Sequence, residues 1–126
     1  MTGFDVVVLG GGISGTRAAL KAADLGGKVC LIEKEVLGRK GFLRRNILLP
    51  DGCYKGGKEP KIWEEHLSNK KQLADKFCED LEVKLNSAGI VLKQGNGSLA
   101  SQNEILIEDE NDSHLVKGGS LILACG

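Results

Sequence analysis

Three glycines near the start of the chain constrain its fold more than any other feature. Gly10, Gly12 and Gly15 form the pattern G-x-G-x-x-G directly after a short apolar run at residues 4–9. That run has the length and valine content of a buried parallel strand. An alanine-rich segment at residues 18–23, with high helix propensity, follows the glycines. The order predicts a strand, a tight glycine turn and a helix.

Each glycine has a separate role in this prediction. Gly10 permits the turn, Gly12 leaves room for a pyrophosphate to approach the backbone, and Gly15 allows the helix to pack closely on the strand. The N-terminus of the helix offers unpaired N–H groups and the positive end of its dipole, and the hydroxyl of Ser14 adds a donor. We therefore expect the phosphates of a dinucleotide to bind at this turn.

A carboxylate after the second strand completes the expected site. The helix ends at Gly26-Gly27, and residues 28–32 form another apolar strand that leads to Glu33. This spacing places the two oxygens of Glu33 where they accept hydrogen bonds from the two cis hydroxyls of an adenosine ribose. Its charge disfavours the 2′-phosphate of NADP.

Composition limits the classes of partner. The chain has 126 residues, enough for one domain, and 17 basic residues balance 17 acidic ones. A neutral balance gives no reason to expect nucleic acid or an anionic membrane as a partner. Met1 is followed almost at once by the first strand, without a basic leader or a long apolar run. We expect a cytoplasmic protein.

The four cysteines do not form a metal or redox motif, because no two are close in sequence. We expect Cys30 and Cys125 within apolar strands and Cys78 in the core, each as a small hydrophobe. Cys53 stands alone in a loop.

The middle of the chain is irregular before a long helix. Residues 39–45 contain four cations, which we interpret mainly as a solvated face, and residues 42–49 could form a short helix. Pro60 suits the first position of a helix over residues 61–87. Its apolar face recurs every three or four residues, at Ala74, Phe77, Cys78, Leu81 and Leu85.

The last third is rich in predicted strands. A short strand at residues 90–93 precedes a three-stranded meander over residues 98–101, 104–108 and 115–117, and residues 121–124 form a final buried strand. His114 lies in a hairpin of the meander, where we expect it to be solvated. An NAD-binding domain does not need a meander in place of its second crossover. The meander therefore favours FAD over NAD as the cofactor.

Four motifs together resemble the FAD-binding domain of the pyridine nucleotide-disulfide oxidoreductases: residues 5–15, residues 29–35 with Leu37-Gly38, residues 89–97 and residues 121–126. The resemblance implies an α/β, Rossmann-like FAD-binding domain with a parallel sheet, crossover helices and a three-stranded antiparallel β-meander. It also implies contacts with FAD, which are Gly10, Gly12, Ser14 and Gly15 at the pyrophosphate, Glu33 at the ribose, Lys34 beside the adenine or ribose, Ala100 at the adenine, and Ala124, Cys125 and Gly126 near the pyrophosphate.

The resemblance covers only the N-terminal part of such an enzyme. It implies that residues 1–126 are the FAD-binding domain of a larger, homodimeric flavoprotein that uses NADH through domains absent from this chain. No catalytic residue is assigned within it. In a gapless register Gly41 and Asn46 replace the redox cysteine pair of the family, and Pro50 replaces a flavin-contacting lysine. We therefore expect no redox disulfide in this chain.

Two other functions stay open from the sequence. One is an NAD-binding Rossmann domain of a dehydrogenase, which the absence of a flavin absorbance band would favour. The other is a non-catalytic nucleotide-binding remnant, which the missing cysteine pair favours.

Overall fold

The computed structural model describes residues 3–35, 37 and 60–125, with the side chains of the long helix described at Gln72 and from Asp75 onward. The elements, in chain order, are β1 (Gly3–Leu9), α1 (Ile13–Asp24), β2 (Val29–Glu33), α3 (Pro60–Ser87), β3 (Val91–Gln94), β4 (Asn96–Ser101), β5 (Glu104–Glu108) and β6 (Ser113–Leu123). The strands form one sheet in the order β3-β2-β1-β6-β5-β4. The expected α/β fold, with crossover helices and a meander, is confirmed.

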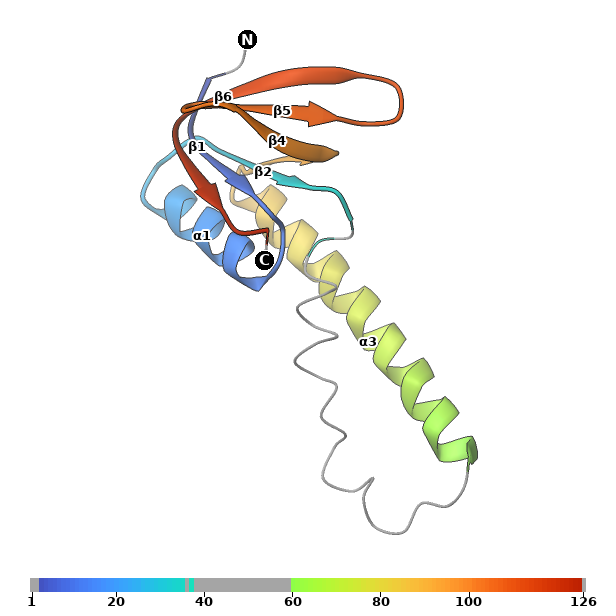
Figure 1. Cartoon of the computed structure of the whole chain (residues 1–126). Coiled ribbons are helices and arrows are strands. Elements are labelled where there is room, and N and C mark those ends of the chain that lie inside the picture. The colour runs from blue at the N-terminus through green and yellow to red at the C-terminus, as the bar shows by residue number, and fades with distance from the viewer. Residues whose placement is uncertain (1–2, 36, 38–59, 126) are drawn as a thin grey trace.

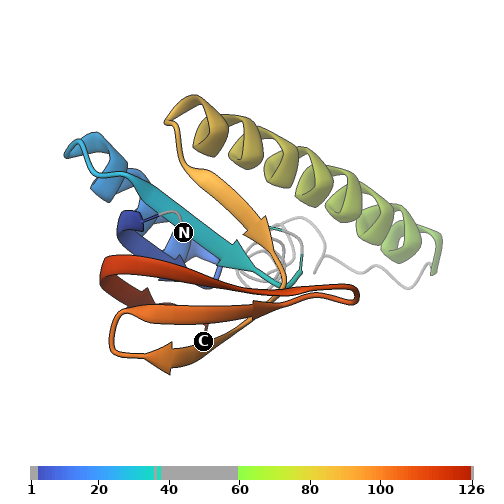
Figure 2. The same cartoon turned by 90° about the horizontal axis from the view of Figure 1, so that it is seen from above.

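The sheet has a parallel and an antiparallel part. β1 pairs in parallel with β2 and with the second half of β6, and β2 pairs in parallel with β3. The first half of β6 pairs antiparallel with β5, which pairs antiparallel with β4. The antiparallel part folds over one face of the parallel part, and the helices cover the other face (Figures 1 and 2). The result is three layers.

Successive side chains of the parallel strands point to opposite faces of the sheet, and each face has its own hydrophobic core. Val7, Cys30 and Ile32 are fully buried against the meander, in a cluster that includes Ile105, Ile107 and Val116. Val8, Val29 and Leu31 face the helices, in a cluster that includes Ala19 and Leu85. Both faces are therefore covered, as a parallel sheet requires.

One strand differs from the prediction. Residues 115–117 and 121–124 were expected as separate strands, but β6 runs without a break from the meander into the parallel sheet. The glycines between them allow this course. A Cβ on Gly118 would lie 2.7 Å from Cγ2 of Val7, and one on Gly119 would lie 3.1 Å from the carbonyl oxygen of Asp5. Gly118-Gly119 thus permits close passage over β1 instead of a turn.

The long helix is confirmed, and it starts at Pro60. Its C-terminal turns pack on the sheet, where Leu85 is fully buried. The rest of α3 extends beyond the sheet (Figure 1). Phe77 was expected in the core but is 37% exposed, whereas its neighbour Cys78 is buried.

Two further expectations need correction. Cys125 was placed within a strand, but it follows the end of β6 and is exposed. His114 was expected to be solvated, but it lies opposite Ile107 on the covered face of the meander. Its Nε2 atom is buried and finds no hydrogen-bond partner in the described part of the chain. Cys30 and Cys78 are buried, as expected.

Other expectations lie outside the described residues, among them the helix at 42–49 and Cys53. No helix among the described residues is long and apolar enough to cross a membrane.

Candidate nucleotide-binding site

The turn between β1 and α1 is built so closely that two of its positions accept only glycine. Gly10 has a φ of +112°, and a Cβ there would overlap the carbonyl of Ala124 and lie 2.8 Å from the nitrogen of Cys125. A Cβ on Gly15 would overlap the carbonyl oxygen of Gly10. The turn is fixed to its neighbours by the N–H of Gly10, which donates to the carbonyl of Ile32 at 2.8 Å.

Gly12 differs from both, because a Cβ there would meet no atom of the described structure within 4 Å. Gly12 is the N-cap of α1 and makes no side-chain capping bond, and the first turn contains no acidic residue. In the described part of the chain, the N–H groups of residues 12–15 have no acceptor. Open space beside free donors at a helix N-terminus fits an anionic group.

Thr16 reinforces this turn. Its N–H donates to the carbonyl of Gly12 at 3.0 Å, and its hydroxyl donates to the same oxygen at 2.8 Å. Thr16 is 3% exposed, and these hydrogen bonds satisfy its buried hydroxyl group. They hold the first turn of α1 with its N–H groups directed outward.

The carboxylate of Glu33 lies beside the glycine turn and is held by backbone donors. Its Oε2 accepts from the N–H of Gly11 at 2.6 Å. Its Oε1 accepts from the N–H groups of Lys34 at 2.8 Å and Glu35 at 3.2 Å. The Gly11 bond joins the carboxyl ends of β1 and β2, the place where open α/β sheets bind ligands.

The structure brings most of the expected site residues to this edge. Gly10, Gly12, Ser14 and Gly15 lie in the turn and the first turn of α1, with Ser14 exposed. Glu33 ends β2 and the exposed Lys34 follows it. Ala124 joins them, since its N–H donates to the carbonyl of Leu9 at 2.7 Å, and Cys125 is next to it.

Ala100 stands apart from this group. Gly126 lies outside the described residues. Ala100 is an exposed residue near the far end of β4. Gly95, which precedes β4, donates its N–H to the Glu33 carbonyl at 3.1 Å.

Sequence reasoning missed Gly11. A Cβ on Gly11 would lie 2.6 Å from Cδ2 of Leu37 and 3.0 Å from Cβ of Glu33, so this position also requires a small residue. The fingerprint leaves this position open. The one signal was that Gly11 completes a run of three glycines.

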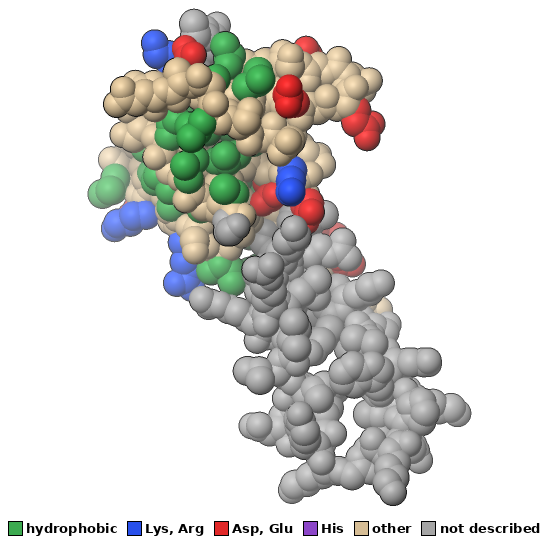
Figure 3. Space-filling model, viewed as in Figure 1, with side chains coloured by type: hydrophobic (Ala, Val, Ile, Leu, Met, Phe, Trp, Pro, Cys, Tyr) green, Lys and Arg blue, Asp and Glu red, His purple; other side chains and the backbone are tan. Residues whose placement is uncertain are grey.

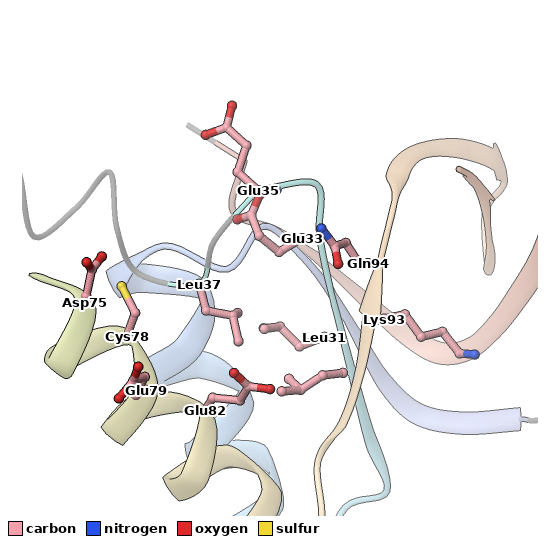
Figure 4. Close-up of a pocket in the computed structure, with 11 residues that line it drawn as sticks. Leu31, Glu33, Glu35, Leu37, Asp75, Cys78, Glu79, Glu82, Lys93 and Gln94 are labelled. Atoms are coloured by element: carbon pink, nitrogen blue, oxygen red, sulfur yellow. The ribbon is translucent and has the colours of Figure 1, made fainter. Parts of the chain in front are cut away.

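A cavity of about 500 Å³ lies next to Glu33, between α3, β2 and β3. Figure 4 shows the side chain of Glu82 on α3 pointing toward the strands across it. Among the described residues, its charged lining is acidic apart from Lys93, with the carboxylates Glu33, Glu35, Asp75, Glu79 and Glu82. This charge disfavours phosphate in the cavity and favours the Gly12 side of Glu33 for an anionic group.

The matching family model is described as pyridine nucleotide-disulphide oxidoreductase and covers residues 4–126. The chain is 27% identical to a dihydrolipoyl dehydrogenase of Acholeplasma laidlawii and 30% identical to one of Chlamydia trachomatis. Each match covers 98% of this chain, but only 40% and 30% of the respective relative. The chain thus spans less than half the length of these relatives. A resemblance closest to dihydrolipoamide dehydrogenase, another name for that enzyme, was what the sequence motifs predicted.

The matches extend over 140 and 141 residues, so the relatives contain positions that this 126-residue chain lacks. A gapless register therefore does not relate the whole chain to them. The assignment of Gly41 and Asn46 to the redox cysteine positions depends on such a register, and it falls outside the described residues.

A solved structure supports the same fold. The flavoprotein disulfide reductase RclA of Escherichia coli, in its Cu(II) complex, aligns with the whole chain at a TM-score of 0.75 and 15% identity. The alignment covers 29% of that protein.

Proposed function

The chain belongs to the pyridine nucleotide-disulphide oxidoreductase family, and from this premise we propose that it is the FAD-binding portion of a dihydrolipoamide dehydrogenase-like flavin oxidoreductase. Proteins of this family are FAD-dependent oxidoreductases. One observation carries the proposal. The N–H groups of residues 12–15, which have no acceptor among the described residues, lie beside a carboxylate held in place by backbone bonds, at the carboxyl ends of adjacent strands.

The proposed roles follow from this arrangement. Donors at Gly12, Ser14 and Gly15 bind the pyrophosphate, while Gly10 and Gly15 allow the turn to close on β6 and α1. Glu33 binds the adenosine ribose and orients it relative to the phosphates. FAD supplies the electron-carrying isoalloxazine, and these residues bind and orient its adenosine half.

The remaining expected contacts support FAD less directly. Ala124, Cys125 and Gly126 are proposed to lie against the pyrophosphate, since the backbone of 124–125 contacts Gly10. Lys34 is proposed to lie beside the adenine or ribose, and Ala100 at the adenine through its backbone.

The activity of a complete enzyme is a further part of the proposal. NADH would bind to domains outside this chain, and the parent protein would be a cytoplasmic homodimer. The second half of β6 supports a larger protein, because beyond Gly118 it pairs only with β1 among the described residues. Leu123 on this half is 55% exposed. Apolar side chains gather on the face that β1, β6 and α1 form (Figure 3).

Disulfide chemistry is not proposed for this chain. Cys30 and Cys78 are buried in different layers, and Cys125 is exposed at the end of β6. The meander and the family match over residues 4–126 favour FAD over the alternative of an NAD-binding dehydrogenase domain.

The test is a calorimetric titration of the purified chain with FAD, ADP, FMN and NAD. We expect FAD and ADP to bind with similar affinity, because the chain supplies the adenosine half of the site, and FMN not to bind. Tighter binding of NAD than of FAD would overturn the cofactor assignment. Binding of FMN in place of ADP would overturn the assignment of this edge to adenosine diphosphate.

A further inference from the structure

Among the described residues, the only buried polar or charged side chain is that of Thr16, which is 3% exposed. Thr16 directly follows Gly15 near the start of α1. An apolar side chain could fill this place without a hydrogen-bond partner, whereas a buried hydroxyl needs one. The partner that the hydroxyl has therefore indicates what it does.

The hydroxyl of Thr16 bonds to the carbonyl of Gly12. The distance from Oγ1 to this oxygen is 2.8 Å, against 3.2 Å to the carbonyl oxygen of Ile13. A hydroxyl carries a single proton, so the shorter contact receives it. The Gly12 oxygen also accepts the backbone N–H of Thr16 at 3.0 Å. This carbonyl thus accepts two hydrogen bonds from one residue.

Two bonds to the Gly12 carbonyl act on the other end of the same peptide group, which is the N–H of Ile13. They draw electron density toward the oxygen and so make this N–H a stronger donor. A trans peptide also holds its C=O and N–H in opposite directions, so a carbonyl fixed toward the helix directs the N–H out of its N-terminus. The N–H of Ile13 has no acceptor in the described part of the chain. It directly follows Gly12, where a Cβ would meet nothing within 4 Å, so a phosphate oxygen has room to approach it.

We propose that Thr16 is a positioning residue for the pyrophosphate, whose hydroxyl acts through the Gly12 carbonyl to orient and strengthen the N–H of Ile13 as a donor to a phosphate oxygen. This inference rests on the proposed function. It adds Thr16 and Ile13 to the residues that the sequence motifs predicted for the site. Thr16 itself does not touch the ligand, because its hydroxyl is buried and bonded to the backbone.

Two substitutions separate the hydroxyl from the rest of the side chain. Thr16→Val replaces the hydroxyl by a methyl group of similar size, and Thr16→Ser keeps the hydroxyl and removes the methyl group. Binding of ADP and of adenosine is followed by NMR of the ¹⁵N-labelled chain, which also measures weak affinities. Thr16→Val is expected to weaken ADP binding about two- to fivefold, as one charge-assisted bond loses part of its strength. Its affinity for adenosine, which has no phosphate, should stay unchanged, and Thr16→Ser should bind ADP as the unmodified chain does.

A second readout needs no ligand. Polarisation of the peptide between Gly12 and Ile13 deshields its nitrogen, so loss of the hydroxyl bond should move the ¹⁵N signal of Ile13 upfield in Thr16→Val. Thr16→Ser should leave this signal close to its position in the unmodified chain. If Thr16→Val does not fold, Thr16→Ala, which also lacks the hydroxyl, is measured in its place with the same expected results.

Several results would overturn the inference. Equal losses of ADP and adenosine binding in Thr16→Val would mean that Thr16 only stabilises α1, and unchanged ADP affinity would mean that its hydroxyl does not act on the site. The same loss in Thr16→Ser as in Thr16→Val would assign the effect to packing instead of the hydroxyl. Failure of ADP to bind the unmodified chain would instead reject the proposed function. In that case an unmoved Ile13 signal in Thr16→Val would separately show that Thr16 does not polarise this peptide.

Discussion

We expect Gly12 to serve ligand binding, and Gly10 and Gly15 to serve the fold. The perturbation is a single methyl group, introduced as Gly12→Ala, Gly10→Ala or Gly15→Ala. In the described structure the methyl at Gly12 meets nothing within 4 Å, whereas the other two overlap backbone atoms. We therefore expect Gly12→Ala to impair binding alone and the other two to impair folding.

The stability changes follow from these geometries. At Gly12 the backbone has a φ of −77° and a ψ of −167°, which alanine adopts without strain. A poorer N-cap costs about 0.5–1 kcal/mol, and lower entropy of the unfolded chain returns about 0.4–1 kcal/mol, so the net change is close to zero. At Gly10 the left-handed φ costs about 1–3 kcal/mol and the overlap with Ala124 about 1–3 kcal/mol more.

The assays are thermal unfolding and titration with ADP. Gly10→Ala should lower Tm by roughly 10 °C or more, at about 3–5 °C per kcal/mol for a chain of this size. Gly12→Ala should leave Tm within about 3 °C of the unmodified chain. Its methyl group takes the space of the phosphate and should weaken ADP binding about tenfold or more, the loss expected for one charge-assisted hydrogen bond.

Two results would refute this reasoning. Unchanged ADP affinity in Gly12→Ala would show that the phosphates do not approach this turn. A loss of stability in Gly12→Ala as large as that in Gly10→Ala would show that the open space beside Gly12 is not open in solution.

Three other predictions concern the core. Burial raises the pKa of the Cys30 thiol from 9.0 to about 11. The folded state therefore keeps the proton more tightly than the unfolded state, so the free energy of unfolding is unaffected below pH 9. It falls by about 2–3 kcal/mol as the pH rises through 11. Urea unfolding measured at each pH should show that Cys30→Ala lacks this loss of stability at high pH. The same pH dependence in the variant and the unmodified chain would contradict a raised pKa at Cys30. A thiol reagent at pH 8 should modify the exposed Cys125 much faster than the buried Cys30 and Cys78, as peptide mapping by mass spectrometry would show; equal rates would mean that the core opens readily. Leu85→Ala should cost about 2–5 kcal/mol in urea unfolding, against less than about 1 kcal/mol for the 65% exposed Val83→Ala, and equal costs would argue against the packing of α3 on the sheet.

The βαβ start of the chain was predictable because its signals are local. A short apolar run, a glycine turn and an alanine-rich helix each depend on neighbouring residues, and β1, α1 and β2 appear where expected. The placement of Glu33 beside the turn follows from the same geometry, since the carboxyl ends of parallel strands meet at one edge.

The failures come from contacts distant in sequence. Gly118-Gly119 signals a turn locally, and only the neighbouring Val7 and Asp5 reveal that it permits close passage of β6. Phe77 continues the apolar periodicity of α3, but it is 37% exposed while the adjacent Cys78 is buried. Gly11 carries no expected role until the strand brings Glu33 to its N–H. Side-chain periodicity predicts which face of a helix is apolar, but it does not predict which residues of that face are covered by the rest of the fold.

The most direct test of the account is the response of individual amide groups to ADP and FAD, followed by NMR of the ¹⁵N-labelled chain. The N–H signals of residues 12–15 should shift strongly with either ligand, together with that of Gly11 beside Glu33. Signals of the hairpin between β5 and β6 should stay in place. Shifts confined to the acidic cavity or to the meander, with the glycine turn unaffected, would contradict the assignment of this edge to the adenosine diphosphate of FAD.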